Sequence, residues 1–259
     1  MLRPRITPCL LVRNGGLVKT RQFGEDKYVG YPINAVKIFN EKAVDELIVI
    51  DIDATRLGAE PNYSLIQRLA DESRMPLCYG GGIKTSEQAE RITQMGVEKV
   101  AISSDIIQSP DLIAKMAEAL GQQSIVGVLD VKKSLFNRYV VHTHNGTKKV
   151  AGKLSDWIRR LQSFGIGEII INSIDRDGMQ NGYDLELVHK VKDLMTVPST
   201  FLGGASSLED IGDLIKFLGI GCCAAGSLFV FKGKYRAVLI NYPEFEKKLE
   251  LINKSLLVK

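Results

Sequence analysis

Short apolar runs and amphipathic stretches alternate along the 259 residues of the chain. The apolar runs are continuous, which is typical of parallel strands buried on both faces, and helical spacing follows them. We expect strands at 6–12, 47–52, 75–78, 99–103, 124–131, 168–172, 199–202 and 222–225. We expect helices at 32–42, 63–72, 86–95, 111–120, 157–163, 185–194, 208–217 and 242–256.

Eight strand–helix units predict a closed parallel (β/α)8 barrel, the TIM-barrel fold, with residues 1–259 as a single domain. An open, doubly wound sheet is the alternative, but it needs a topological switch and usually has fewer units. One segment leaves the repeat, because residues 138–144 alternate apolar and polar and Asn145-Gly146 then gives a hairpin signal. We therefore expect a hairpin excursion near 138–151.

The pattern also repeats over half the chain. The segment that ends at Asp53 is echoed by the one that ends at Asp175, and Gly81 in one glycine cluster matches Gly203 in the other. Glycines at strand ends let backbone N–H groups approach a phosphate. Since active sites of this fold lie at the carboxyl ends of the strands, two half-barrels predict two phosphate sites at one mouth. The alternative is that both clusters are only turns.

Candidate site residues follow the strands. Asp130 ends the fifth strand, where partial burial would suit it to acid/base chemistry, although a loop-capping aspartate is the alternative. Its counterpart in the half-barrel repeat is Leu11, which cannot transfer a proton. Lys19 could pair with a phosphate or be a solvated loop lysine. The predicted ligand-binding residues are Lys19, Asp51, Gly82, Ser103, Ser104, Asp177, Gly178, Gly204, Gly226 and Ser227.

A second group of charged residues lies at the opposite ends of the strands. Two are basic and two acidic, and each lies at the start of a different strand. Charges at such positions usually face water, but four of them around a barrel can instead form a ring of salt bridges over its floor. The four residues are Arg5, Glu46, Lys99 and Glu168.

The composition is that of an ordinary globular protein, with a net charge of +4. No basic run interleaved with aromatic residues is present, so an anionic small ligand is favoured over nucleic acid. The lysines near the C-terminus are interpreted as a solvated helix face: Lys247, Lys248, Lys254 and Lys259.

The cysteines and histidines indicate neither a disulfide framework nor a metal site. All four cysteines lie in apolar runs, which predicts reduced core residues of a cytoplasmic protein. The three histidines lack the neighbours of a zinc site. No leader pattern opens the chain and no run reaches the roughly 18 apolar residues of a membrane span. We expect no metal and no cofactor.

These motifs resemble the HisF family, the cyclase subunits of imidazole glycerol phosphate synthase. The resemblance runs from Met1 to about Phe231 and rests on the segments 5–10, 45–47, 80–83, 173–178, 181–184 and 203–205. It implies a (β/α)8 barrel with a HisH-type glutaminase on its N-terminal face. It implies that ammonia crosses a gate formed by Arg5, Glu46, Lys99 and Glu168 and reaches the other face. There the family joins ammonia to the bisphosphorylated substrate PRFAR in histidine biosynthesis, which yields imidazole glycerol phosphate and an aminoimidazole carboxamide ribotide (AICAR).

The chain departs from the family pattern at the cyclisation side. The gate residues and the second catalytic aspartate, Asp130, are intact. The first catalytic aspartate is Leu11, and the aspartate of the following Asp-Gly is Asn14. The phosphate loops keep their glycines, but the serine before the second glycine pair is Leu202 and a threonine after the second strand is Asp53. Ser103 and Ser104 stand where the family commonly has Asn-Thr or Asn-Ser.

These departures lead to the hypothesis of a HisF-like paralogue that passes ammonia to another acceptor, such as a sugar in surface-polysaccharide (lipopolysaccharide) biosynthesis. Loss of one of two acid/base carboxylates costs roughly 10²–10⁴ in rate. Two alternatives stay open. One is a working histidine-pathway cyclase that uses Asp130 alone, and the other is a non-catalytic conduit that activates the glutaminase.

Overall fold

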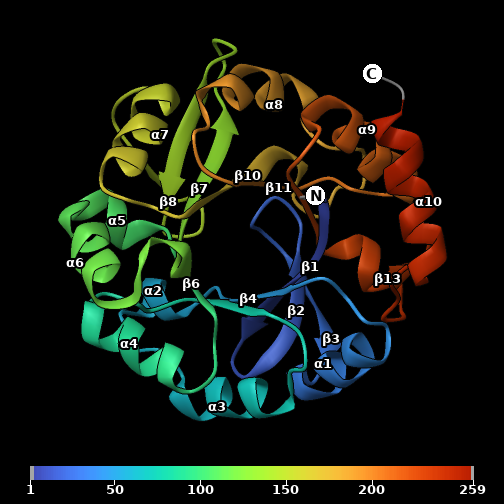
Figure 1. The fold of residues 1–259 in the computed structure, drawn as a ribbon, viewed down its shortest axis with the longest axis horizontal. Helices are drawn as coiled ribbons and strands as arrows, with labels where there is room; N and C mark the ends of the chain where they lie inside the picture. The colour runs from blue at the N-terminus through green and yellow to red at the C-terminus, as the bar shows by residue number, and fades with distance from the viewer. Residues whose placement is uncertain (1–2, 258–259) are drawn as a thin grey trace.

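The computed structural model describes residues 3–257 and shows a closed barrel of eight parallel strands with helices around it (Figure 1). Strand β1 pairs with β4 and β12, and β7 pairs with β10, which closes the ring and confirms the predicted (β/α)8 fold. The barrel strands are β1 (Arg5–Arg13), β4 (Leu47–Asp51), β5 (Leu77–Gly80), β6 (Lys99–Ile102), β7 (Ile125–Lys133), β10 (Glu168–Ser173), β11 (Ser199–Leu202) and β12 (Cys222–Ala225).

A helix follows each barrel strand and packs its apolar stripe on the outer face of the barrel. The helices are α1 (Pro32–Glu41), α3 (Tyr63–Glu72), α4 (Ser86–Gln94), α6 (Asp111–Leu120), α7 (Leu154–Ser163), α8 (Leu185–Val191), α9 (Leu208–Leu218) and α10 (Phe245–Leu256), with the short α2 (Ala54–Leu57) and α5 (Ser104–Gln108) before α3 and α6. Helix α8 is shorter than the predicted 185–194, because its last turn is a separate 3₁₀ helix, Lys192–Leu194. No helix within residues 3–257 has the length and apolar character that crossing a membrane requires.

Local sequence signals begin several of these helices. Thr85 Oγ1 accepts a hydrogen bond from the backbone N of Gln88, and Ser207 and Asp210 form a reciprocal capping box on α9. Caps of this kind contribute about 1 kcal/mol each. They fix where each helix leaves the barrel rim, so the loops that carry the candidate site begin at defined points.

Two hairpins extend the barrel at its carboxyl end. Strands β8 (Tyr139–Thr143) and β9 (Lys148–Lys149) continue antiparallel from β7, in the region where a hairpin was expected. The sequence interpretation missed the other hairpin, formed by β2 (Gly16–Thr20) and β3 (Asp26–Gly30). Most of β3 is exposed, so it has no apolar pattern, but the positive-φ pair Asn14-Gly15 between β1 and β2 was a readable turn signal. A third, short pair joins β13 (Phe231–Lys232) and β14 (Ala237–Val238).

The barrel interior is a separate apolar cluster. Its side chains do not belong to the core between strands and helices, and they fill the axis as in other barrels of this class. The interior residues are Cys9, Ile48, Cys78, Ala101, Val126, Ile170 and Ala224, with Leu11, Ile50, Val128 and Leu202 packed at one end. All four cysteines are free and buried, as their apolar runs predicted.

One surface prediction was wrong. Lys247 and Lys254 on α10 are exposed, but Lys248 is buried, and its Nζ lies 2.6 Å from Oδ1 of Asp45. The other oxygen of Asp45 accepts a hydrogen bond from the backbone N of Ile6. Helical spacing places Lys248 on the inward stripe of α10, and only the packing of that helix against the barrel floor showed its partner. Lys259 lies outside the described residues.

Candidate functional site at the barrel mouth

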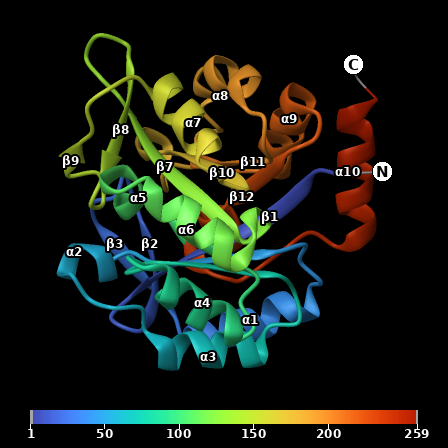
Figure 2. The ribbon, with the colours of Figure 1, turned by 60° about the vertical axis from the view of Figure 1, so that its left-hand side comes forward.

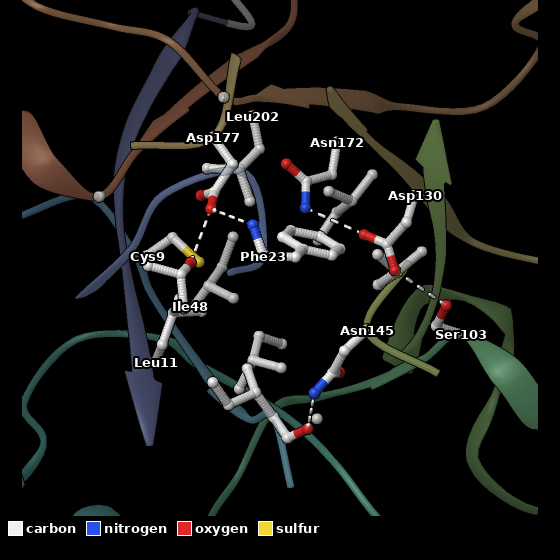
Figure 3. A pocket seen from close by; sticks show the side chains of 18 of the residues that line it. Cys9, Leu11, Phe23, Ile48, Ser103, Asp130, Asn145, Asn172, Asp177 and Leu202 are labelled. Carbon is white, nitrogen blue, oxygen red and sulfur yellow. Dashed lines mark hydrogen bonds between the residues drawn. The ribbon is translucent and has the colours of Figure 1, made fainter. Parts of the chain in front are cut away.

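A cavity of about 140 Å³ opens at the carboxyl ends of the barrel strands (Figure 3). The predicted ligand-binding residues line it, except that Gly80 and Gly81 rather than Gly82 contribute from the first glycine cluster. Leu11, Asn172, Leu202 and Asn145 also line it, and none of these was predicted as a ligand-binding residue. The structure thus collects in one place residues that are up to 218 positions apart, from Cys9 to Ser227.

Asp130 lies in the polar wall of this mouth. Its Oδ1 accepts a hydrogen bond of 2.9 Å from Asn172 Nδ2, and its Oδ2 accepts one of 3.4 Å from Ser103 Oγ. Burial raises the pKa of Asp130 to about 6, while these two hydrogen bonds act in the opposite direction. A carboxyl group that titrates near neutral pH can both give and take a proton, so Asp130 is suited to acid/base chemistry.

Asn172 is a residue of this wall that the sequence interpretation did not identify. Its bond to Asp130 orients the amide, because only Nδ2 can donate to a carboxylate. Its Oδ1 is buried and has no hydrogen-bond partner among the described residues. A ligand with an N–H or O–H group can satisfy this acceptor. The available signal was strand alternation, since Asn172 follows Glu168 and Ile170 on the inward face of β10.

Aliphatic side chains form part of the mouth across from Asp130. Figure 3 shows Leu11 across the mouth from Asp130. Leu11 and Ile50 pair in adjacent strands, and both pack with Leu202 at the end of the interior cluster. Asp130 therefore has no carboxylate facing it from position 11.

Lys19 is not the exposed loop residue of the alternative interpretation. It lies in β2, is 5% exposed, and its Nζ donates to the carbonyl oxygen of Cys9. A Cβ on Gly226 would lie 2.6 Å from Lys19 Nζ, so a side chain at this position would displace the ammonium group. Burial lowers the pKa of Lys19, and the negative charge of Asp177 opposes this shift. The lysine is held at the mouth next to Gly226.

Asp177 and Gly178 bind the β2–β3 hairpin. Asp177 Oδ2 accepts hydrogen bonds from Thr20 Oγ1 at 2.6 Å and from the backbone N of Phe23 at 3.3 Å (Figure 3). A Cβ on Gly178 would lie 2.0 Å from the carbonyl oxygen of Thr20. These contacts hold the hairpin against the mouth.

Asp51 and Asp53 organise the loop after β4. Asp51 Oδ1 accepts bonds of 3.1 Å from the backbone N of Asp53 and of Ala54. Burial raises the pKa of Asp51, and these two bonds partly offset the increase. Asp53, which departs from the family pattern, forms ion pairs with Arg13 and Arg56. Its negative charge is therefore compensated by neighbouring side chains.

The two glycine clusters have matching geometry. A Cβ on Gly81 would lie 2.5 Å from the carbonyl oxygen of Asp51, and one on Gly203 would lie 2.7 Å from that of Ser173. Asp51 and Ser173 are themselves equivalent in the half-chain repeat. Positive φ angles of 74° at Gly82 and 103° at Gly204 also favour glycine. Both loops thus pack without side chains against the preceding strand, as the repeat predicts.

At the other end of the barrel, four charged side chains close a ring. Arg5 pairs with Glu46 at 2.5 Å and with Glu168 at 2.9 Å. Lys99 pairs with the same two carboxylates, at 2.7 Å and 2.8 Å.

Burial opposes the charge on Lys99, but Glu168 and Glu46 raise its pKa above the ordinary value. Burial likewise disfavours a charged Glu168, yet Lys99 and Arg5 hold its pKa below the ordinary value. Lys99 and Glu168 therefore stay ionised at neutral pH.

Fold and site together define a (β/α)8-barrel protein with a cavity at the carboxyl ends of its strands and an ionic ring on its floor. The sequence model of a family described as "Histidine biosynthesis protein" matches residues 5–236. This match and the curated relatives described next show that the chain belongs to the HisF family.

Curated relatives cover nearly the whole chain. It is 56% identical to "Putative imidazole glycerol phosphate synthase subunit hisF3" of Vibrio vulnificus, over 97% of this chain and 98% of that protein. It is 51% identical to "Putative imidazole glycerol phosphate synthase subunit hisF2" of Pseudomonas aeruginosa, over 95% of this chain and 98% of that protein. It is 35% identical to "Imidazole glycerol phosphate synthase subunit HisF" of Exiguobacterium sibiricum, over 88% and 91%.

Proposed function

We propose that this chain is the ammonia-receiving subunit of a glutamine amidotransferase and that its acceptor is not PRFAR. A HisH-type glutaminase binds the N-terminal face, and ammonia enters through the ring of Arg5, Glu46, Lys99 and Glu168. The acceptor is another molecule, such as a sugar in surface-polysaccharide biosynthesis. The observation that carries this proposal is the contrast between a complete ionic ring and a mouth with Leu11 opposite Asp130.

The barrel interior supports the transfer of neutral ammonia. Along β10, inward residues run from Glu168 in the ring through Ile170 in the apolar cluster to Asn172 in the mouth. An apolar lining disfavours ammonium and other ions, because desolvating a charge without a partner is costly. The interior is packed, so ammonia passes only when its side chains move.

The altered mouth argues against efficient PRFAR cyclisation. The family reaction uses two facing carboxylates, and an aliphatic side chain at one of them removes roughly 10²–10⁴ in rate. The names of relatives are consistent with this division. Four relatives at 51–56% identity are named as putative subunits, two of them numbered hisF2 and hisF3, whereas three at 34–35% are named HisF subunits without that qualifier.

Turnover of PRFAR with ammonium chloride tests this proposal. We expect the purified chain to form imidazole glycerol phosphate at less than about one-hundredth of the rate of a histidine-pathway HisF. We also expect it to co-purify with a glutaminase and to stimulate glutamine hydrolysis. Near-normal cyclisation would overturn the proposal and favour a histidine-pathway cyclase that uses Asp130 alone.

A second candidate function, a non-catalytic conduit, is favoured by the apolar wall of Leu11, Ile50 and Leu202. In this case the chain activates the glutaminase and hands ammonia to a separate enzyme. Asp130→Asn separates the two functions. It abolishes product if the acceptor reacts in this mouth, and it leaves amidation unchanged if the acceptor is bound elsewhere.

A further inference from the structure

The positive charge of the chain is concentrated in one hairpin. Residues 131–153, which we call the basic hairpin, contain six lysines and arginines and no aspartate or glutamate. Since the net charge of the chain is +4, all other residues together carry −2. Within residues 3–257, only Lys133 of this set forms an ion pair, with Glu186, and the others are exposed. The six are Lys132, Lys133, Arg138, Lys148, Lys149 and Lys153.

The tip of the basic hairpin is apolar. Leu135 is 102% exposed and Phe136 is 85% exposed, and the two are adjacent in sequence. Burial of such a side chain is worth roughly 1.5–3 kcal/mol, so a partner that covers both would gain binding free energy. Single exposed apolar residues are ordinary, but a pair at a projecting tip within a cationic surface favours an interface.

A groove of about 970 Å³ lies between the hairpin and the region of α7 and α8. Its wall carries Phe136, Arg138, Lys149 and Lys153, and aliphatic side chains such as Val140 and Leu194 line it as well. This concave shape fits an inserted polypeptide segment better than a flat bilayer. The aliphatic lining accommodates apolar side chains, whereas a nucleic-acid backbone would leave it unused. The cations at its edge complement carboxylates.

The basic hairpin also reaches the barrel mouth. His144 and Asn145, at its β8–β9 turn, line the mouth cavity. Asn145 Nδ2 donates a hydrogen bond of 2.7 Å to the carbonyl oxygen of Ile52, which fixes this turn to the opposite rim. Figure 2 shows the hairpin on the side of the barrel away from the N-terminus, so a protein bound there would lie beside the mouth.

We propose that the basic hairpin is the docking surface for a separate ammonia-consuming enzyme, which binds it with an acidic, apolar-centred surface and covers the mouth. The inference rests on the proposed function in its conduit form. Leu135 and Phe136 supply the apolar anchor, and the exposed cations supply orientation and a salt-dependent association rate. The partner's carboxylates pair with cations that have no ion-pair partner in the described chain.

Site-specific photo-crosslinking in the native host identifies the partner. A photoreactive residue at position 136 is compared with one at position 257, just after α10, where Leu257 is 82% exposed. We expect position 136, and not position 257, to crosslink to an enzyme that uses ammonia. Capture of a protein that uses no ammonia would overturn the proposal.

Binding is then measured between the purified chain and that enzyme. We expect Leu135→Ser/Phe136→Ser and Lys148→Glu/Lys149→Glu each to weaken the affinity at least tenfold. Lys247→Glu/Lys254→Glu, an equal charge reversal on exposed positions of α10, should change it less than twofold. Equal binding by all variants would overturn the proposal, as would hairpin-dependent binding to anionic vesicles or to single-stranded DNA without binding to the enzyme.

Stimulation of the glutaminase separates this proposal from the function on which it rests. The hairpin variants should stimulate glutamine hydrolysis as the wild-type chain does, because the ring and the floor are unchanged. If the wild-type chain fails to stimulate a glutaminase, the proposed function fails. If stimulation is normal but the hairpin variants bind the enzyme normally, only the docking surface is wrong.

Discussion

Leu11 and Asp130 determine which chemistry the mouth can support. They lie on opposite walls, and only Asp130 is hydrogen-bonded to polar neighbours, namely Asn172 and Ser103. Leu202 adds a second aliphatic side chain beside the glycine pair of the second predicted phosphate loop. At positions 11 and 202, aliphatic side chains stand where the family pattern has an aspartate and a serine.

A second carboxylate should restore the family reaction. We expect Leu11→Asp/Leu202→Ser to raise PRFAR turnover with ammonium chloride by about 10²-fold, because general acid/base catalysis contributes that amount or more. Leu11→Asn/Leu202→Ser is the matched control, since it changes shape and polarity without adding a proton acceptor. Equal turnover by both variants would show that Leu11 does not limit the cyclisation.

The raised pKa of Asp130 makes stability depend on pH. Its folded pKa of about 6 lies above the ordinary value near 3.9, so its favourable contribution is present in acid and is lost as the pH rises through 6. We expect Asp130→Asn to increase the free energy of unfolding above pH 7 by about 2–3 kcal/mol, with the gain vanishing near pH 4. Urea unfolding across this pH range measures it.

The exposed substitution Asp156→Asn on α7 is the control, because it also removes one carboxylate. A gain for Asp130→Asn that is constant with pH would contradict the assignment.

Helix α10 is attached to the barrel floor by polar contacts next to the ring. Tyr242, just before the helix, donates a hydrogen bond of 2.8 Å to the carbonyl oxygen of Ile6, and Asp45 binds both Lys248 and the backbone N of Ile6. Ile6 follows Arg5, and Asp45 precedes Glu46. The helix thereby holds two ring residues through their chain neighbours.

Removal of the buried Lys248 ammonium should destabilise the fold. We expect Lys248→Met to lower the free energy of unfolding by about 3 kcal/mol, because it leaves Asp45 with an uncompensated charge. Lys247→Met, on the exposed side of the same helix, should change it by less than about 0.5 kcal/mol. Thermal or urea unfolding compares the two, and similar losses would refute the buried pair.

The whole barrel joins an ionic floor to a mouth through an apolar axis. Small side chains, such as those of Ala101 and Ala224, belong to this axis. This arrangement makes the interior, rather than the surface, the route for ammonia in the proposed function. One substitution on the inner face of a strand should therefore separate glutaminase stimulation at the floor from the delivery of ammonia to the mouth.

Enlarging Ala224 tests the route. We expect Ala224→Leu to leave glutaminase stimulation intact but to lower the transfer of glutamine nitrogen at least tenfold, while added ammonium still supports amination. ¹⁵N-amide glutamine competed against unlabelled ammonium measures this ratio in the aminated product. Cys223→Leu, which overpacks the outer core from the same strand, is the control, since each change costs about 1–3 kcal/mol of stability. Equal isotope ratios would exclude passage along the axis.

The amino-acid sequence by itself determined the barrel, its half-chain repeat and the two ends at which charged residues gather. Continuous apolar runs and glycine clusters are local signals, so they can be recognised in the sequence without knowledge of tertiary contacts. Asp130 and the four ring residues were readable because each lies at a strand end.

Only the tertiary structure decided which polar groups face one another. The burial of Lys19 and Lys248, the orientation of Asn172 toward Asp130 and the contact of Asp177 with the β2–β3 hairpin each join residues far apart in sequence. Partners of this kind are set by how the elements pack, and no local pattern records them. The closed ring follows the same rule, because four charges become one network only when the strands close into a barrel.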